Sequence, residues 1–105
     1  NRMFLAFLDG LAGDADAVRV LWQGIRYAEA NEFTWDVLGG RLLLAKLLES
    51  RGEMDPARLE YQKLRELARG AGNRLVADDC ATALRSMGAP PSQPPPPSQR
   101  GATQR

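Results

Sequence analysis

The chain has 105 residues, of which 44% are apolar and 26% charged, and its formal net charge is +1 at neutral pH. This composition is typical of a globular domain, and the interleaved acidic and basic residues argue against a dedicated nucleic-acid surface. The sequence has no histidine and a single cysteine, which excludes an internal disulfide and a Cys/His zinc site and removes the commonest general base.

The first predicted helix covers residues 2–11. Its apolar side chains recur at helical spacing: Phe4, Leu5, Leu8 and Leu11. A second helix is predicted over residues 15–30, with Asp14 or Asp16 as its N-cap. Trp22 in this helix is large for a surface position, and we expect it to pack against a neighbouring hairpin.

The clearest pair of predicted helices covers residues 34–51 and 55–70. Thr34 stands where an N-cap is expected, and the leucines that follow at spacings of three and four lead to Gly52, a helix-ending residue. Asp55 is predicted to cap the second helix. Because the turn between the helices is short, they should pack antiparallel.

Two adjacent glycines, Gly39 and Gly40, interrupt the first helix of this pair. Each costs about 1 kcal/mol of helix stability relative to alanine, so a compensating role is expected. One interpretation is close approach of another helix, for which only glycine leaves room. The other is a kink or a flat patch that admits a peptide backbone.

A last, more polar helix is predicted over residues 74–87, as suits the end of a helical stack. Cys80 within it is expected to be a small buried apolar residue, with a redox role as the alternative. Residues 88–105 are rich in proline and are predicted to form a disordered tail. PxxP spacing from Pro91 to Pro97 leaves open that this tail is a peptide ligand rather than a linker.

The central pair of helices resembles a tetratricopeptide repeat (TPR). That family combines small and bulky residues at fixed places around a turn glycine, and the matching residues are Leu44, Ala45, Leu48, Gly52, Ala57 and Tyr61. Arg41 stands where the family usually has tryptophan. Segments on both sides repeat the pattern at offsets of 39 or 40 residues, for example Leu5-Ala6 against Leu44-Ala45.

The resemblance implies an all-α fold in which antiparallel hairpins stack over residues 1–87. About five helices would form a short right-handed solenoid of about two and a half repeats, similar to the long repeats of bacterial signalling proteins. The first predicted helix would then be the end of the first arm of a hairpin, with its start upstream. By the same resemblance Ala45 and Ala57 lie where the two central helices are closest, and Tyr61 fills the space before the next hairpin.

The resemblance also implies a function in protein binding, on the concave side lined by the first helix of each hairpin. The expected groove residues are Met3, Phe7, Gly39, Leu42, Lys46, Glu49 and Ser50. We therefore expect a protein–protein interaction module of a larger, cytoplasmic, bacterial signalling or regulatory protein, which binds a peptide or a helix. The same residues would otherwise form only a solvated or intramolecular face.

A second hypothesis is a structural spacer or dimerisation segment at the C-terminus of a kinase or transcriptional regulator. Its assembly surface would be Phe4, Phe7 and Trp22. Under both hypotheses the partner is a protein or peptide, a second copy, or another domain of the same chain, and neither nucleic acid nor a membrane.

No catalytic residue, cofactor or metal is expected. The chain lacks a glycine-rich phosphate loop, and its serines have no histidine to activate them. Its longest apolar run, around residues 42–48, is far shorter than the roughly 20 residues of a membrane-spanning helix. The sequence therefore predicts a protein that is not an enzyme.

Overall fold

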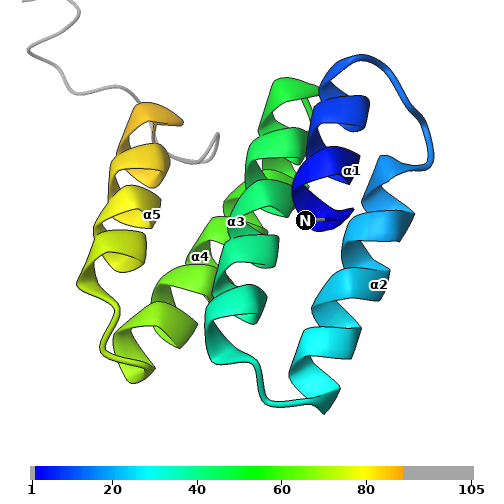
Figure 1. Cartoon of the computed structure of the whole chain (residues 1–105). Coiled ribbons are helices and arrows are strands. Elements are labelled where there is room, and N and C mark those ends of the chain that lie inside the picture. The colour runs from blue at the N-terminus through cyan, green and yellow to red at the C-terminus, as the bar shows by residue number, and fades with distance from the viewer. Residues whose placement is uncertain (1, 89–105) are drawn as a thin grey trace, which may run out of the picture.

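The computed structural model describes residues 2–88, which contain five α-helices and no strand (Figure 1). The helices are α1 (Arg2–Leu11), α2 (Ala17–Ala30), α3 (Thr34–Ser50), α4 (Met54–Gly70) and α5 (Arg74–Ser86). The predicted all-α fold is confirmed for this part of the chain. The bounds of α1 are those predicted, and the bounds of the other helices differ from the predicted ones by at most two residues. Of the predicted tail, residues 89–105 lie outside the described residues.

The connections between successive helices share one hydrogen-bonded turn. Each contains a residue in the left-handed backbone region, which is glycine at three turns and Glu32, with φ of 58°, at the fourth. The next backbone N–H donates to the carbonyl five residues earlier, at 2.8–3.0 Å: Asp14 to Asp9, Phe33 to Ala28, Glu53 to Leu48 and Asn73 to Ala68. This is the Schellman arrangement, and it returns the chain at once into an antiparallel helix.

The predicted N-caps Thr34 and Asp55 are wrong, because both residues already lie inside their helices. The N-caps are Phe33 and Glu53, whose side chains make no cap hydrogen bond. The physical reason is the turn itself, since the residue that closes the preceding helix also begins the next one. Asp55 instead accepts a hydrogen bond from Arg58 at 3.0 Å and places a negative charge in the first turn of α4.

The other helix starts also differ from simple capping. Asp16 is the N-cap of α2 but makes no side-chain cap hydrogen bond, and its carboxylate pairs with Arg19 instead. Asn73 is the one N-cap among the described helices α2–α5 whose side chain accepts a cap bond, from the N–H of Val76 at 3.1 Å.

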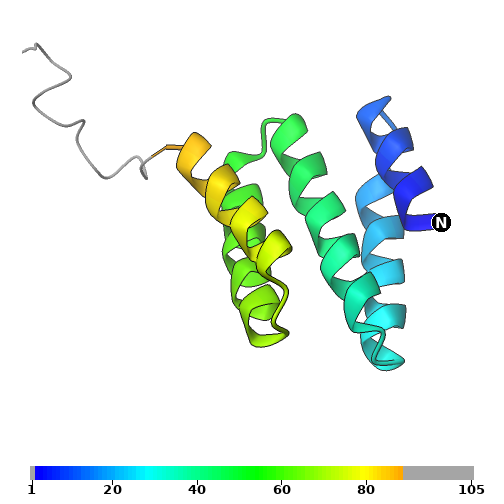
Figure 2. The ribbon, with the colours of Figure 1, turned by 60° about the vertical axis from the view of Figure 1, so that its left-hand side comes forward.

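The core consists of two clusters that meet at α3. Each helix packs against the next, and α1 also packs against α3, which lies between the α1–α2 pair and the α4–α5 pair (Figure 2). The N-terminal cluster consists of the buried residues Ala6, Ala17, Leu21, Ile25, Leu44 and Leu47. The C-terminal cluster consists of the buried residues Leu38, Ala45, Tyr61, Leu64, Ala68, Ala77 and Cys80. Because α3 contributes to both clusters, it is the helix that joins the two halves.

Glycine permits close approach at three positions of the N-terminal half, Gly10, Gly24 and Gly40. A Cβ added to Gly10 of α1 would lie 2.8 Å from the Cβ of Ala17 and 2.8 Å from both methyl carbons of Leu47. One added to Gly40 of α3 would lie 2.7 Å from the sulfur of Met3 and 2.9 Å from Cγ1 of Ile25. The close-approach interpretation is thus confirmed for Gly40. It fails for Gly39, which faces open space.

A charged group holds α2, α3 and α4 together. Arg41 of α3 donates to Glu60 of α4 at 2.7 Å and to Glu29 of α2 at 3.1 Å, and its guanidinium lies 5.2 Å from the ring centre of Trp22. The side chains of Arg41 and Glu60 are only 12% and 9% exposed, so each depends on the other for neutralisation. Trp22 therefore contacts the neighbouring hairpin, as predicted.

We expect opposite effects from alanine at the two exceptional glycines of this fold. Gly10→Ala should lower the free energy of unfolding by about 1–3 kcal/mol, because the Cβ of Ala17 cannot move away without shifting a helix. Gly39→Ala should raise it by about 1 kcal/mol, because the added methyl meets no atom and favours the helix. Urea unfolding followed by circular dichroism measures both. Equal destabilisation by the two variants would contradict this packing.

The Arg41–Glu60 pair should behave as a coupled unit. Arg41→Met should lower the free energy of unfolding by about 3 kcal/mol, because it leaves the buried Glu60 carboxylate without its partner. The double variant Arg41→Met, Glu60→Leu should be clearly more stable than the sum of the single losses predicts. A double-mutant cycle in urea tests this, and strictly additive losses would show that the pair is not coupled.

Candidate functional site

The expected groove residues on α3 form one exposed face, but only in part. Gly39 and Lys46 are exposed, and Leu42 lies between them, half-buried against the C-terminal cluster. Their spacing of three and four residues places them on one side of the helix. This part of the predicted groove is thus a continuous strip of surface.

The two groove residues at the end of α3 are engaged in local hydrogen bonds. Glu49 is half-buried and accepts a hydrogen bond of 2.7 Å from the hydroxyl of Tyr61. The Ser50 hydroxyl donates to the carbonyl of Leu47 at 2.8 Å. Burial and the bond to Glu49 raise the pKa of Tyr61 far above its ordinary value, so this hydroxyl remains a donor over the whole physiological range. Glu49 therefore serves the core as well as the surface.

The two groove residues predicted on α1 belong to the N-terminal packing. Met3 is half-buried, and its side chain lies against Gly24 and Gly40, where it fills the space that these glycines leave. Phe7 is also half-buried in the N-terminal cluster, with its ring 6.2 Å from that of Phe4. Met3 and Phe7 therefore contribute to the N-terminal packing, with part of each side chain still accessible.

Trp35 is the prominent surface residue that the sequence analysis left out of the groove. It is 77% exposed in the first turn of α3, four residues before Gly39 and on the same side. We call the set Trp35, Gly39, Leu42 and Lys46 the α3 face. Leu75, which is 79% exposed, holds the same place at the start of α5. The signal was present in the sequence as the 4–3–4 spacing from Trp35 to Lys46.

The assembly surface of the second hypothesis is only partly exposed. Phe4 is 49% exposed, but Phe7 and Trp22 are half-buried in the N-terminal cluster. Trp22 has a guanidinium on its ring from Arg26, at 5.7 Å, in addition to that of Arg41. These contacts make Trp22 a packing residue rather than a free anchor for a partner.

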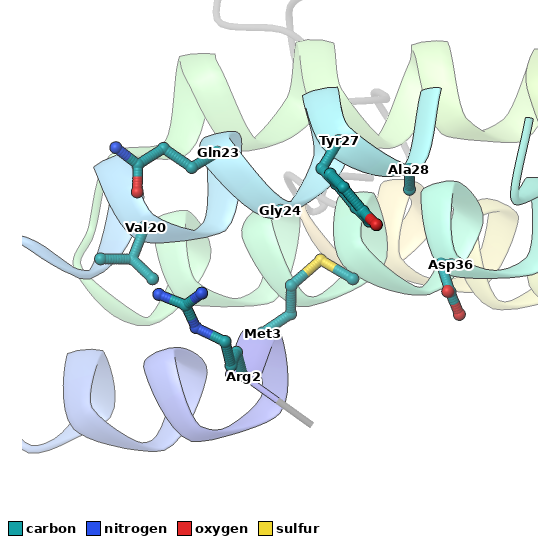
Figure 3. A pocket seen from close by; sticks show the side chains of 8 residues that line it. All are labelled: Arg2, Met3, Val20, Gln23, Gly24, Tyr27, Ala28 and Asp36. Carbon is teal, nitrogen blue, oxygen red and sulfur yellow. The ribbon is translucent and has the colours of Figure 1, made fainter. Parts of the chain in front are cut away.

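A cavity of about 490 Å³ opens where α1, α2 and α3 meet (Figure 3). Its lining consists of Arg2, Met3, Val20, Gln23, Gly24, Tyr27, Ala28 and Asp36. Arg2 and Asp36 give it one cationic and one anionic side chain, and Met3 extends from α1 towards Gly24 (Figure 3). The lining holds no serine, cysteine or histidine, so it offers no nucleophile–base pair.

Cys80 is buried in the C-terminal cluster, as predicted. Burial, together with the nearby carboxylate of Asp79, raises the pKa of its thiol to about 11, while Lys46 and Arg65 act in the opposite direction. The thiolate is the reactive form of cysteine, so a raised pKa and full burial make this residue inert.

Residues 2–88 contain neither a cluster of metal-binding side chains nor a helix that could span a membrane. No group of three or more His, Cys, Asp or Glu side chains there is arranged to hold a metal ion. None of the five described helices has the length and apolar character to cross a bilayer.

Comparisons of the chain with protein-family models, with curated proteins and with solved structures find no match.

The burial of Cys80 predicts an alkaline loss of stability. The folded state holds the thiol proton that the unfolded chain releases near pH 9, so the free energy of unfolding should be level up to about pH 9 and fall as the pH rises towards 11. In Cys80→Ala the fall should begin only near pH 10, where Tyr61 of the unfolded chain ionises. Urea unfolding across this pH range measures both curves. Identical curves for the two proteins would show that Cys80 does not contribute.

Proposed function

We propose that the chain is a protein-interaction module that binds a peptide or helix of a partner protein on the α3 face. The observation that carries the proposal is the exposed Trp35 with the open Gly39 one turn beyond it. An indole left in water adds little burial energy to folding but is suited to binding, since tryptophan is among the residues that most often dominate interface energies.

The α3 face suggests the chemistry of its ligand. Gly39 has no side chain and nothing near it, so a partner backbone can approach the helix there. Lys46 is exposed two turns further on and offers a positive charge. A short segment with an apolar side chain for Trp35 and an acidic residue for Lys46 would satisfy both ends of the face.

We also propose that the hairpins stack as a TPR-like right-handed solenoid. Support comes from positions that the sequence relates by 39 or 40 residues and that are buried alike. These pairs are Ala6 and Ala45, Ala17 and Ala57, Leu21 and Tyr61, and Ala28 and Ala68. The shared turn geometry adds to this support, because it gives successive hairpins the same shape.

Selection from a displayed library of random 12-residue peptides tests peptide binding. Peptides selected on the native chain should bind the variant Trp35→Ser, Lys46→Glu at least about 10-fold more weakly, because it removes the apolar anchor and reverses the charge. The matched control is Leu59→Ser, Lys63→Glu, which changes an equally exposed pair on α4.

Both variants should retain the helical circular dichroism of the native chain, since every substituted side chain is exposed. Failure to select any peptide, or equal binding by the α3 variant and the native chain, would contradict the proposal. Loss of binding in the α4 control would place the binding surface elsewhere.

A further inference from the structure

The outer side of α1 is apolar and exposed. Leu5 is 58% exposed and Leu8 is 43% exposed, and together with Phe4 and Leu11 they form a set that we call the α1 stripe. All four residues are among the large apolar side chains that the described surface leaves most accessible. A stripe of this kind on a short helix is unusual for a surface that faces only water.

The repeat pattern identifies what normally covers such a stripe. At an offset of 39 residues, Leu5 and Leu8 correspond to Leu44 and Leu47 of α3. Those two leucines are fully buried in the N-terminal cluster, which also contains Leu21 and Ile25 of α2, and Leu47 lies against Gly10 of α1 as well. In α3 this side is therefore the docking surface for the preceding helix. The same side of α1 lacks that helix in the described structure.

Arg2 supports the same correspondence. It is the counterpart of Arg41, whose guanidinium lies on Trp22 and pairs with Glu29, both from the helix before α3. Arg2 instead lines the cavity at the end of α1 (Figure 3). A covering helix with an aromatic and an acidic residue at the spacing of Trp22 and Glu29 would give Arg2 the surroundings that Arg41 has.

A cavity adjoins the N-terminal end of α1. It has a volume of about 490 Å³ and lies between Gly24 and Tyr27 of α2 and Asp36 of α3. Further helical turns in line with α1 would pass through this space.

The opposite end of the molecule differs. Apart from Leu75 in its first turn, the exposed side of α5 carries polar and charged residues: Asp78, Asp79, Thr82, Arg85 and Ser86. Such a surface is suited to water, as expected for the terminal helix of a stack. The contrast indicates that the apolar α1 stripe serves a specific neighbour.

We infer that the α1 stripe is half of an interface with a further helical hairpin, whose second helix packs on α1 as α2 packs on α3 and continues into it. The covering helix has the chemistry of α2: small and branched apolar residues on one side, with an aromatic and an acidic residue placed for Arg2. A second copy of the domain is a poorer occupant. Two 10-residue helices, each about 15 Å long, cannot bury the roughly 1,200 Å² of a stable interface. The inference does not depend on peptide binding by the α3 face.

A graft onto the full chain tests the inference. A copy of residues 14–40 is joined directly to Arg2, so that the copied Gly40 precedes Arg2 as the native one precedes Arg41. The graft should raise the thermal midpoint by about 5 °C or more and slow hydrogen exchange of the α1 amides. The matched control graft carries Leu21→Asp and Ile25→Asp in the copied helix only, and it should give neither effect.

A second pair of variants assigns the gain to the stripe. Leu5→Ser, Leu8→Ser should change the midpoint of the native chain little, because both side chains are exposed, but should cancel the gain in the grafted chain. Equal midpoints for the graft and its control would overturn the inference. So would a native chain that sediments as a dimer with its α1 amides already protected, because a second copy would then be the occupant.

Discussion

The fold depends on the hydrogen-bonded turn that connects each helix to the next. In every connection from α1 to α5, one backbone N–H reaches back five residues and a left-handed residue reverses the chain. In the last three connections the residue that donates this bond is also the N-cap of the following helix. No further residue therefore separates the turn from the next helix. Antiparallel packing of neighbouring helices follows from this constraint, and with it the division of the core into two clusters around α3.

The central helix α3 has one buried side and one exposed side. One side is buried between α2 and α4, where Arg41 binds carboxylates from both helices beneath the ring of Trp22. In the family that the sequence resembles, a tryptophan usually stands at the position of Arg41. In this chain the indole beside Arg41 belongs to Trp22 of α2. The other side carries Trp35 and Gly39 in open surroundings. The same helix thus supports the core on one side and carries the proposed binding face on the other.

The exposed surfaces of the first and last described helices differ in polarity. The α1 stripe is apolar and lies next to a cavity, whereas the exposed side of α5 is polar except for Leu75. A stack of hairpins needs a polar surface only where the stack ends. The two proposals therefore assign different neighbours to these surfaces: a short segment that binds reversibly to the α3 face, and a helix that remains in place to the α1 stripe.

The sequence by itself determined the helices, because their apolar spacing and turn glycines are local properties that each segment carries alone. Positions of five helices, the burial of Cys80 and the need for space at Gly40 could all be predicted from it. Part of the candidate site could be predicted too, since Gly39 and Lys46 share one side of their helix.

Only the tertiary structure decided which side chains remain at the surface. The contacts of Met3 with Gly24 and Gly40, and of Glu49 with the hydroxyl of Tyr61, join residues of different helices and are not visible in the sequence. Trp35 has the helical spacing of the α3 face. It is exposed because no other helix of residues 2–88 covers its side chain. The exposure of a side chain is set by neighbours that are distant in the sequence, and helical spacing alone carries no information about them.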